Sequence, residues 1–435
     1  MSLSKQEMDN YTAILREELI PAMGCTEPIA IAYAAAKAKS LLPEDVERYV
    51  VNCSGNMIKN VKGVTVPNSN GQKGIPAAAA LGIVGGNPDK QLEVIADVTD
   101  EDRENCRKLV ARNVCDVNLV ENVPGLYIDV QLFGKNHSSQ VIISGFHTHI
   151  ARMVQDGKVL VDEEEKDPTT ANAVASGDRK KMTLKGILEY ADTVALEEVK
   201  PVLESQWKLN TAISQDGLDE PWGAQVGRTI LATYGNGVRS RAIAWAAAGS
   251  DARMSGDPKP VVINSGSGNQ GITVSMPVLV YAKEWQLSEE KTYRALLVSN
   301  LISVYIKHYI GPLSAFCGAV SAACGAGAAI TYMASGDYAH VARTITNTLG
   351  TVSGIVCDGA KPSCAAKIAA SLQAAILSHY MSMNDIQFGA GEGIVEKDVE
   401  ETIKNIGYIG KIGMKETDKD ILNVMIDKVN VNECL

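Results

Sequence analysis

Apolar positions at helical spacing dominate both ends of the chain. Tyr11, Ile14 and Leu19 recur every three to five residues, which predicts a helix that begins near residue 6. Pro21 interrupts the pattern, and a second helical stretch follows over residues 29–38. From about residue 182 onward the helical pattern returns over residues 184–203, 222–248, 293–308, 317–334, 341–352, 364–381 and 403–409. Most of the protein is therefore expected to be α-helical.

Between these helical parts the apolar positions alternate, as they do in strands. The alternation predicts strands over residues 92–98, 117–120, 126–132 and 139–144, and a polar helix over residues 100–113. A hairpin followed by a polar linker is expected from residue 154 to residue 172, whereas small polar residues over 49–75 predict loops. The fold class is therefore α+β, with a mainly α-helical domain (residues 1–88 and 181–435) and an inserted small α+β domain (residues 89–180).

Composition places the chain among globular proteins and excludes several partners. The 435 residues are 46% hydrophobic and 21% charged, with a net charge of −10, which argues against binding to nucleic acid or an anionic membrane. The uncharged stretch 316–333 is rich in Gly and Ala, so a buried helix is expected there and not a membrane span. Nine cysteines behind a polar N-terminus without the apolar core of a signal peptide predict a reducing, cytoplasmic location.

Three late cysteines, Cys317, Cys357 and Cys364, form the most informative pattern. Their spacing matches neither a zinc knuckle nor the four-cysteine runs of ferredoxins. Three thiolates without an obvious fourth could hold an iron–sulfur cluster with one iron open to a substrate. The alternative is that each is a small buried apolar side chain, and Cys324, two helical turns after Cys317, competes for its place.

Cys25 stands in a turn, Gly24–Pro28, directly before a predicted helix. The positive end of that helix is expected to favour a thiolate and to lower the pKa of Cys25 toward neutrality. Glu27 is expected to orient Cys25, to meet a substrate ammonium group or to cap the helix. The alternative for Cys25 is a buried cysteine in a tight turn.

Two Ser-Gly-Asn loops are suited to binding a carboxylate, because backbone N–H groups in Gly-rich turns form anion sites. They contain Asn52, Ser54 and Asn56 in the first loop and Ser265, Ser267 and Asn269 in the second. Tight turns without a ligand are the alternative. His147 and His149 alternate along a predicted strand, which places both on one face, and we expect surface or interface histidines there.

These motifs resemble those of the L-cysteine desulfidases, which are related to the α chain of the iron–sulfur L-serine dehydratases. The resemblance implies a [4Fe–4S] cluster on Cys317, Cys357 and Cys364, with a fourth iron that acts as a Lewis acid on a small amino acid. It also implies that Cys25 is the base or a resting ligand of that iron. The implied reaction is β-elimination of L-cysteine to pyruvate, ammonia and hydrogen sulfide, in the helical domain of a homodimer.

Three alternatives stay open. The same mechanism could dehydrate L-serine, a pyridoxal-phosphate lyase could perform the same elimination, or the chain could bind an amino acid without catalysis. Cys434 could cap the open iron, as a terminal cysteine does in related dehydratases, although this chain ends one residue later. Cys106 and Cys115 are expected to be structural.

Overall fold

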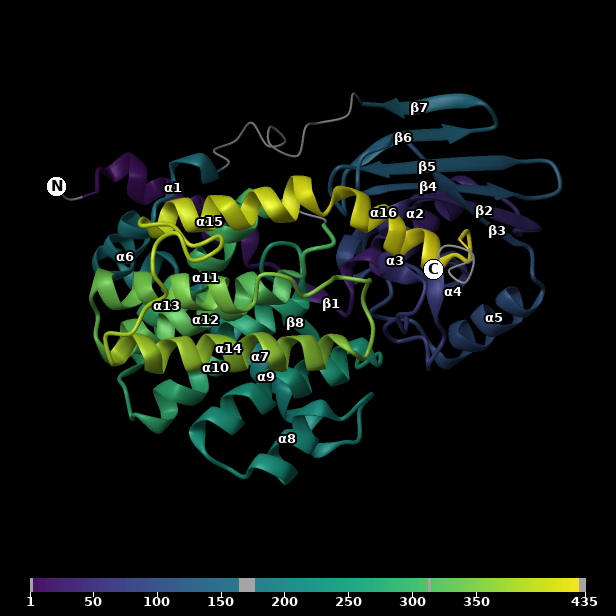
Figure 1. Ribbon diagram of the computed structural model, residues 1–435. Helices are drawn as coiled ribbons and strands as arrows, with labels where there is room; N and C mark the ends of the chain where they lie inside the picture. The colour runs from purple at the N-terminus through teal and green to yellow at the C-terminus, as the bar shows by residue number, and fades with distance from the viewer. Residues whose placement is uncertain (1–2, 164–176, 312–313, 430–435) are drawn as a thin grey trace.

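The computed structural model describes residues 3–163, 177–311 and 314–429. The chain forms a helical lobe and a lobe built on a β-sheet (Figure 1). The α-helices of the helical lobe are α1 (Lys5–Glu18), α6 (Leu184–Thr193), α7 (Lys200–Asp219), α8 (Val226–Tyr234), α9 (Val238–Met254), α10 (Gly268–Glu284), α11 (Glu289–Ile310), α12 (Gly318–Ala334), α13 (Tyr338–Thr351), α14 (Cys364–Met383) and α15 (Val399–Tyr408). Short helical turns are η2 (Arg179–Lys181), η3 (Leu196–Glu198) and the π-helix η4 (Ile409–Gly413). The predicted α+β class with mainly helical content is confirmed.

Helix α12 lies among α10, α11, α13 and α14 and is buried along nearly its whole length. Its glycines allow close approach of neighbouring backbones. A Cβ at Gly325 would lie 2.4 Å from the carbonyl oxygen of Ser299 on α11, and one at Gly327 would lie 2.9 Å from that of Ala375 on α14. The uncharged stretch around residue 325 is therefore the centre of a tightly packed helical core.

The sheet lobe contains six strands in the order β3-β2-β4-β5-β6-β7. The strands are β2 (Arg48–Ser54), β3 (Cys115–Val120), β4 (Tyr127–Phe133), β5 (Ser138–Ser144), β6 (Ile150–Gln155) and β7 (Lys158–Asp162). β2 and β3 pair in parallel, and the other neighbouring strands of this sheet pair antiparallel. Helices α2 (Thr26–Leu41) and α4 (Gly74–Gly85) pack on the sheet, α5 (Asp100–Ala111) packs on α4, and the short η1 (Pro88–Glu93) contacts α2.

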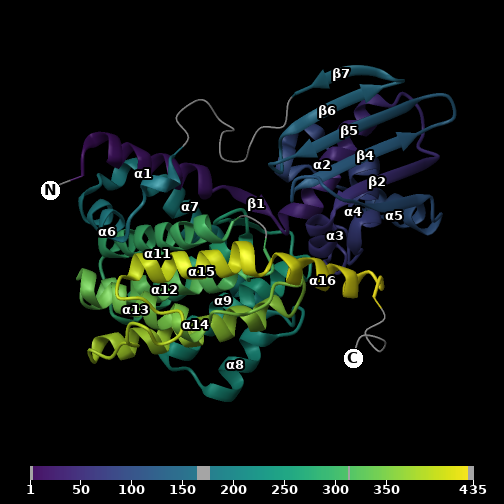
Figure 2. The same ribbon diagram turned by 45° about the horizontal axis from the view of Figure 1, so that its top comes forward.

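Two connections join the lobes beside the covalent chain. Strand β1 (Pro21–Met23) pairs antiparallel with β8 (Pro260–Val262) of the helical lobe. Helix α16 (Lys415–Met425) continues from α15 across to α3 (Gly55–Val61), as both ribbon views show (Figure 2). Lys59 of α3 forms an ion pair with Asp418 of α16. Residues close to each other in this region therefore come from distant parts of the sequence.

Two predictions of local structure are wrong. Residues 49–75 contain β2 and α3, because Tyr49, Val51 and Cys53 alternate into the core even though polar residues surround them. The predicted strand over 92–98 is the end of η1 followed by turns. Leu92, Ile95 and Val98 recur every third residue, a spacing that suits tight helical turns as well as the apparent alternation suits a strand.

The other predicted elements are present with shifted ends. The strands over 117–120, 126–132 and 139–144 are β3, β4 and β5, and the hairpin is β6–β7, while its linker extends outside the described residues. The predicted helix over 222–248 is divided into α8 and α9, and the one over 184–203 is divided into α6, η3 and the start of α7. The division into domains at residues 88 and 180 stays a prediction; in the structure α2, β2 and α4 from the first 88 residues pack within the sheet lobe.

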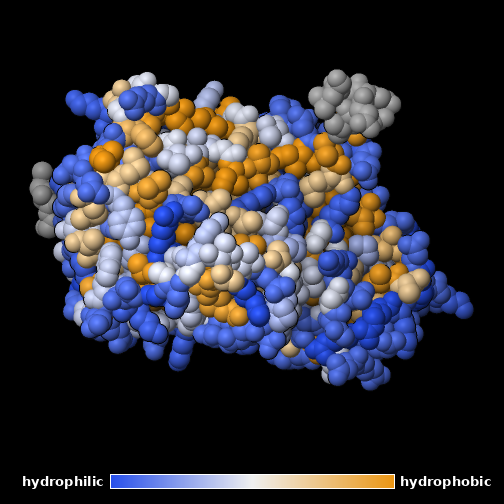
Figure 3. Space-filling model, turned by 60° about the horizontal axis from the view of Figure 1, so that its bottom comes forward, coloured by the Kyte–Doolittle hydropathy of each residue, from blue (hydrophilic) through white to orange (hydrophobic). Residues whose placement is uncertain are grey.

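Within the three described ranges, none of the helices has both the length and the apolar character needed to cross a membrane. Figure 3 shows one face of the molecule, on which hydrophobic patches lie between hydrophilic ones. Exposed apolar side chains are present on α8 and α14, where Tyr234 is 72% and Leu377 is 48% exposed.

Candidate active site

The three late cysteines lie together at the starts of two helices. Cys317 precedes α12, Cys364 begins α14, and Cys357 lies in the loop between α13 and α14. Two short segments pair antiparallel and bring Cys317 and Cys357 side by side: Cys317 N–H donates to Ile355 O at 3.0 Å, and Cys357 N–H donates to Ala315 O at 2.6 Å. Cys364 Sγ lies 3.7 Å from Gly359 O, and its thiol interacts electrostatically with Cys357. The structure therefore brings the predicted trio together.

The trio lies in a positively charged environment. A hydrogen bond with Cys317 holds the pKa of the Cys357 thiol below its usual value, and the charges of Lys59 and Lys307 act in the same direction. That same bond, together with burial, raises the pKa of Cys317. Lys59 is 2% exposed and Lys307 is 7% exposed, and burial lowers the pKa of Lys307 to about 8. Within the Cys317–Cys357 pair, the negative charge is therefore favoured on Cys357 and the proton on Cys317.

Four helices begin at this region, and their first N–H groups are not capped by the preceding side chain. The N-cap residues are Cys25 of α2, Ser267 of α10, Cys317 of α12 and Ser363 of α14, and none of these described side chains accepts a capping hydrogen bond. Free N–H groups and positive helix ends favour negative charge nearby. Such surroundings suit thiolates, a carboxylate or both.

Cys25 lies where the sheet lobe meets the loop before α10. Its Sγ donates to Glu27 Oε2 at 3.0 Å, and Asn60 Nδ2 donates to Glu27 Oε1 at 3.2 Å. Thr26 Oγ1 donates to Gly266 O at 3.1 Å, which joins the start of α2 to the second Ser-Gly-Asn loop. The prediction of a lowered pKa for Cys25 is wrong: burial, and then the charge of Glu27, raise it, because a buried thiolate beside a carboxylate is unfavourable.

The cysteine trio and Cys25 belong to one closed set of contacts. Gly359, with a φ of +92°, packs so closely on α3 that a Cβ would lie 2.0 Å from Lys59 O, directly beside Asn60. On the other side, a Cβ at Gly318 would lie 2.6 Å from the side chain of Gln270 on α10. Contacts therefore run from α2 through α10 and α12 to the cysteine loop, and back through α3.

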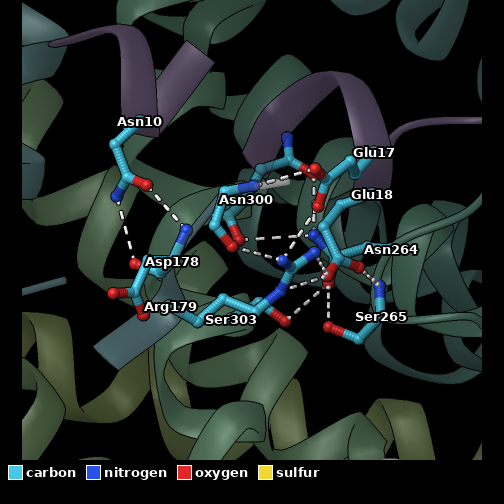
Figure 4. A network of polar contacts seen from close by, with 10 residues as sticks. Asn10, Glu17, Glu18, Asp178, Arg179, Asn264, Ser265, Asn300 and Ser303 are labelled. Atoms are coloured by element: carbon cyan, nitrogen blue, oxygen red, sulfur yellow. Dashed lines mark hydrogen bonds and ion pairs between the residues drawn. The ribbon is translucent and has the colours of Figure 1, made fainter. Parts of the chain in front are cut away.

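The second Ser-Gly-Asn loop is fixed by hydrogen bonds to Glu18, Asn300 and Ser303. Ser265 has a φ of +49°, and its N–H donates to Glu18 Oε2 at 2.9 Å. Asn264 Nδ2 donates to Asn300 Oδ1 at 3.0 Å, and Ser303 donates to Asn264 at 3.1 Å (Figure 4). Arg179 clamps Glu18 in the same network. A strained loop that is fixed in this way presents the start of α10 in one conformation.

The first Ser-Gly-Asn loop is used differently from what its composition predicts. Asn52 Nδ2 donates to Asp129 Oδ2 at 2.9 Å on the sheet, and Ser54 Oγ donates to Gly125 O at 2.6 Å. Both side chains therefore bind their own lobe. Asn56 on α3 differs, since its Oδ1 is buried and has no hydrogen-bond partner among the described residues.

Several residues of this region escaped the sequence analysis. Lys59, Asn60, Gln270 and Lys307 belong to it, as does Arg253, whose charge acts on the Cys25 thiol. The available signals were the Arg at the end of the Ala-rich stretch of α9 and the Lys near the end of the apolar stretch of α11. These residues are recognised as buried, and therefore as candidates for the site, only once the tertiary contacts are known.

The histidine prediction is partly wrong. Residues 145–149 form a turn between β5 and β6, so His147 and His149 do not share the face of a strand. His149 bonds to Ser144 O and pairs with Glu163 at 3.3 Å. Burial lowers the pKa of His147, and the charge of Glu27 opposes that effect. His147 is therefore close to the Cys25–Glu27 pair.

The remaining cysteines lie apart from the trio. Cys324 is fully buried and lies 4.0 Å from Ile345 O on α13, so it does not take the place of Cys317. Cys106 is buried beside Ala77 O at 3.7 Å, and Cys115 begins β3. Cys434 lies outside the described residues.

Known proteins match this chain over most of its length. A family model described as serine dehydratase alpha chain matches residues 89–423. A UPF0597 protein of Desulfitobacterium hafniense is 50% identical over 418 residues, which cover 96% of each chain. A UPF0597 protein of Finegoldia magna is 47% identical over 97% of this chain and 100% of its own length, and one of Treponema denticola is 45% identical over 98% and 100%. This chain therefore belongs to the serine dehydratase alpha chain family.

Proposed function

We propose that this chain is an iron–sulfur-dependent lyase that converts L-cysteine to pyruvate, ammonia and hydrogen sulfide. The observation that carries the proposal is the trio of Cys317, Cys357 and Cys364, held by paired segments beside the buried Lys59 and Lys307. Membership of a dehydratase family supports β-elimination from a small amino acid. A reducing, cytoplasmic location belongs to the proposal, since the cysteines in the described ranges are free thiols.

The chemistry of the three thiols suits an iron–sulfur cluster. Within the described residues, no group of three His, Cys, Asp or Glu side chains is arranged for one metal ion. Three thiols beside two lysines and two helix starts suit an anionic [4Fe–4S] cluster, with Cys317, Cys357 and Cys364 as its ligands. Because Cys317 and Cys357 share a hydrogen bond in this structure, these two residues would give up that bond and its proton if they held a cluster. When bound, the cluster supplies a Lewis-acidic iron that makes the substrate sulfur a better leaving group.

We assign removal of the α-proton to the Cys25–Glu27 pair. Cys25 is a neutral thiol that donates to Glu27, so it acts as a base only after its proton has passed to the carboxylate. Asn60, bound to the other oxygen of Glu27, holds the carboxylate in place for this transfer. The α-proton and the departing HS⁻ leave as hydrogen sulfide, and water converts the remaining enamine to pyruvate and ammonia.

The amino acid is proposed to bind between α3 and the loop before α10. Asn56, Ser265, Ser267 and Asn269 remain the proposed binding residues from the two loops. Asn56 Oδ1 and Asn269 Oδ1 are buried without a hydrogen-bond partner among the described residues, so a ligand donor would satisfy them. For Asn52 and Ser54, which bind their own lobe, we propose a positioning role only.

Dehydration of L-serine by the same site is the second candidate, because the matching family is described as a serine dehydratase chain. The discriminating experiment is oxygen-free purification and cluster reconstitution of the full chain. Iron and acid-labile sulfide are measured first, and then sulfide and pyruvate are measured with L-cysteine, L-serine and D-cysteine.

The expected result is a brown protein that forms sulfide and pyruvate in equal amounts from L-cysteine, and little product from D-cysteine. Faster pyruvate formation from L-serine would make the chain a dehydratase. A borohydride-sensitive aldimine band would indicate pyridoxal phosphate instead. A colourless, inactive protein that still binds an amino acid would be a non-catalytic binding protein.

A further inference from the structure

Arg253, in the last turn of α9, is a buried cation without a counter-charge. Its side chain is 2% exposed, and its Nε has no hydrogen-bond partner among the described residues. Its guanidinium makes no ion pair within the described ranges either, whereas Arg179 binds Glu17 and Glu18 at 2.9 and 2.7 Å. An uncompensated buried charge is strongly destabilising, so a group of this kind needs a partner that comes from outside the chain.

The location of Arg253 identifies where that partner would lie. Its Nε is 2.3 Å from the position of a Cβ at Gly268, so the guanidinium lies against the first residue of α10. Only a glycine permits this approach. The charge of Arg253 also acts on the Cys25 thiol. Arg253 therefore lies against the start of α10, whose N–H groups are uncapped, and close enough to the proposed base for its charge to act on it.

The two residues that follow Gly268 both carry a hydrogen-bond acceptor that is unpaired within the described ranges. Asn269 follows Gly268 directly and binds Met254 Sδ through its Nδ2 at 3.5 Å, which leaves its Oδ1 buried without a partner among the described residues. Gln270 Oε1, which faces Gly318, is also buried and has no hydrogen-bond partner among the described residues. Unpaired acceptors beside an unpaired guanidinium are complementary to a small molecule with an anionic end and a donor-rich cationic end.

We infer that Arg253 binds the α-carboxylate of a free amino acid and that the amide oxygens of Asn269 and Gln270 accept from its ammonium group. This inference rests on the proposed function, because it assigns the substrate's two charged ends within the same site. The planar guanidinium matches a carboxylate bidentately, and an ammonium provides three donors. Arg253 and Cys25 are both buried in this structure, so an amino acid bound to them would be enclosed by the protein.

The test compares ligands that differ by one group. Isothermal titration under oxygen-free conditions is carried out with L-cysteine, with cysteamine, which lacks the carboxylate, and with 3-mercaptopropionate, which lacks the ammonium. The proteins are the unmodified chain, Arg253→Met, Arg253→Lys and the control Arg241→Met, which removes an arginine of α9 that pairs with Glu284.

We expect Arg253→Met to weaken binding of L-cysteine and of 3-mercaptopropionate by about 10- to 100-fold, the range for a lost charged hydrogen bond. Binding of cysteamine stays the same in Arg253→Met. The affinity of Arg253→Lys for L-cysteine should lie between that of the unmodified chain and that of Arg253→Met. The melting temperature of Arg253→Met is unchanged or higher, because Met fills a similar volume without a buried charge. Arg241→Met retains normal binding of L-cysteine.

Failure of the inference is distinguishable from failure of the proposed function. If the unmodified chain binds L-cysteine and both Arg253 variants bind it equally well, the carboxylate assignment is wrong and the lyase proposal stands. The assignment is also wrong if Arg253→Lys weakens the binding of L-cysteine and of cysteamine to the same extent. It is equally wrong if Arg253→Met lowers the melting temperature and weakens the binding of all three ligands. If the unmodified chain binds none of the three ligands, the proposed function itself fails.

Discussion

At the scale of single residues, the position on a helix decides what each cysteine can do. Cys317 and Cys324 lie on the same helix, yet Cys317 precedes the first turn and hydrogen-bonds to Cys357, whereas Cys324 faces α13. Burial raises the pKa of Cys324 without a cationic neighbour. Of these two residues, only Cys317 has both a thiol partner, Cys357, and uncapped helix N–H groups beside it.

This difference predicts opposite results for two serine substitutions. Cys357→Ser should prevent cluster assembly and lower activity by at least about 100-fold, since a hydroxyl is a poor iron ligand beside thiolates. Cys324→Ser should retain both, with at most a modest loss of stability. Iron content and lyase rate after anaerobic reconstitution are the measurements. Equal iron content in the two variants would contradict the assignment of Cys357 as a ligand.

At the scale of elements, the helices around α12 are joined by polar side chains within an apolar core. Thr331 of α12 bonds to Thr344 of α13 at 2.8 Å and to His379 Nδ1 of α14 at 2.9 Å. His379 is 2% exposed, and burial lowers its pKa to about 4. The three helices therefore depend on a neutral histidine.

The stability of this helix group should depend on pH. The ordinary pKa of His in an unfolded chain is about 6.5, so below that pH the unfolded chain binds a proton that the folded chain excludes. The contribution of His379 is fully present above about pH 6.5 and is lost as pH falls toward 4, with a loss of about 2 kcal/mol between pH 7 and pH 5.

Urea denaturation at both pH values checks this expectation. Burial raises the pKa of Asp251 to about 7, which stabilises the folded state as pH falls and opposes the histidine effect. The informative quantity is therefore the difference between the unmodified chain and His379→Gln, which should lose less stability on acidification. His340→Gln, at a partly exposed histidine that pairs with Asp337, is the control. A His379→Gln profile parallel to that of the unmodified chain would show that the protonation is accommodated elsewhere.

At the scale of the whole molecule, the candidate site exists only because two lobes meet. Cys25, Glu27 and Asn60 come from the sheet lobe, whereas the cysteine trio and Arg253 come from the helical lobe. The β1–β8 pair and the passage of α16 to α3 hold these groups together (Figure 1). The predicted homodimer stays a prediction at this scale, and sedimentation of the purified chain would check it.

Asp418 should be the most important single contact of α16. It pairs with Lys59, which is 2% exposed, so Asp418→Asn leaves the buried ammonium of Lys59 without its carboxylate partner and should cost about 3 kcal/mol of unfolding free energy. Asp420→Asn removes an exposed carboxylate from the same helix and should change stability by less than about 0.5 kcal/mol. Chemical denaturation of both variants provides the comparison. Similar values would mean that Lys59 is supported by groups other than Asp418.

Much of the fold could be predicted because it follows from local periodicity. The helices from 184 onward and the strands β3 to β5 have clear apolar spacing, so they were predicted with shifted ends, although the stretches 184–203 and 222–248 each contain two α-helices and not one. The first Ser-Gly-Asn loop could not be predicted, because Tyr49, Val51 and Cys53 form a strand only when β3 and β4 lie on either side. Similarly, Leu92–Val98 satisfies two periodicities, and packing against α2 selected the helical turn.

The sequence by itself determined the types of donors and the elements that carry them. Cysteines directly before or at predicted helix starts, and Ser-Gly-Asn loops, are local features, since caps and turns depend on neighbouring residues. Only the tertiary structure decided which donors meet and in which protonation state. Burial beside Glu27 raised the pKa of Cys25, although the positive end of the helix favours a lower value. Arg253 is buried at a place where no described carboxylate forms an ion pair with it. Desolvation and charge pairing act through space, so they appear only when distant segments come together.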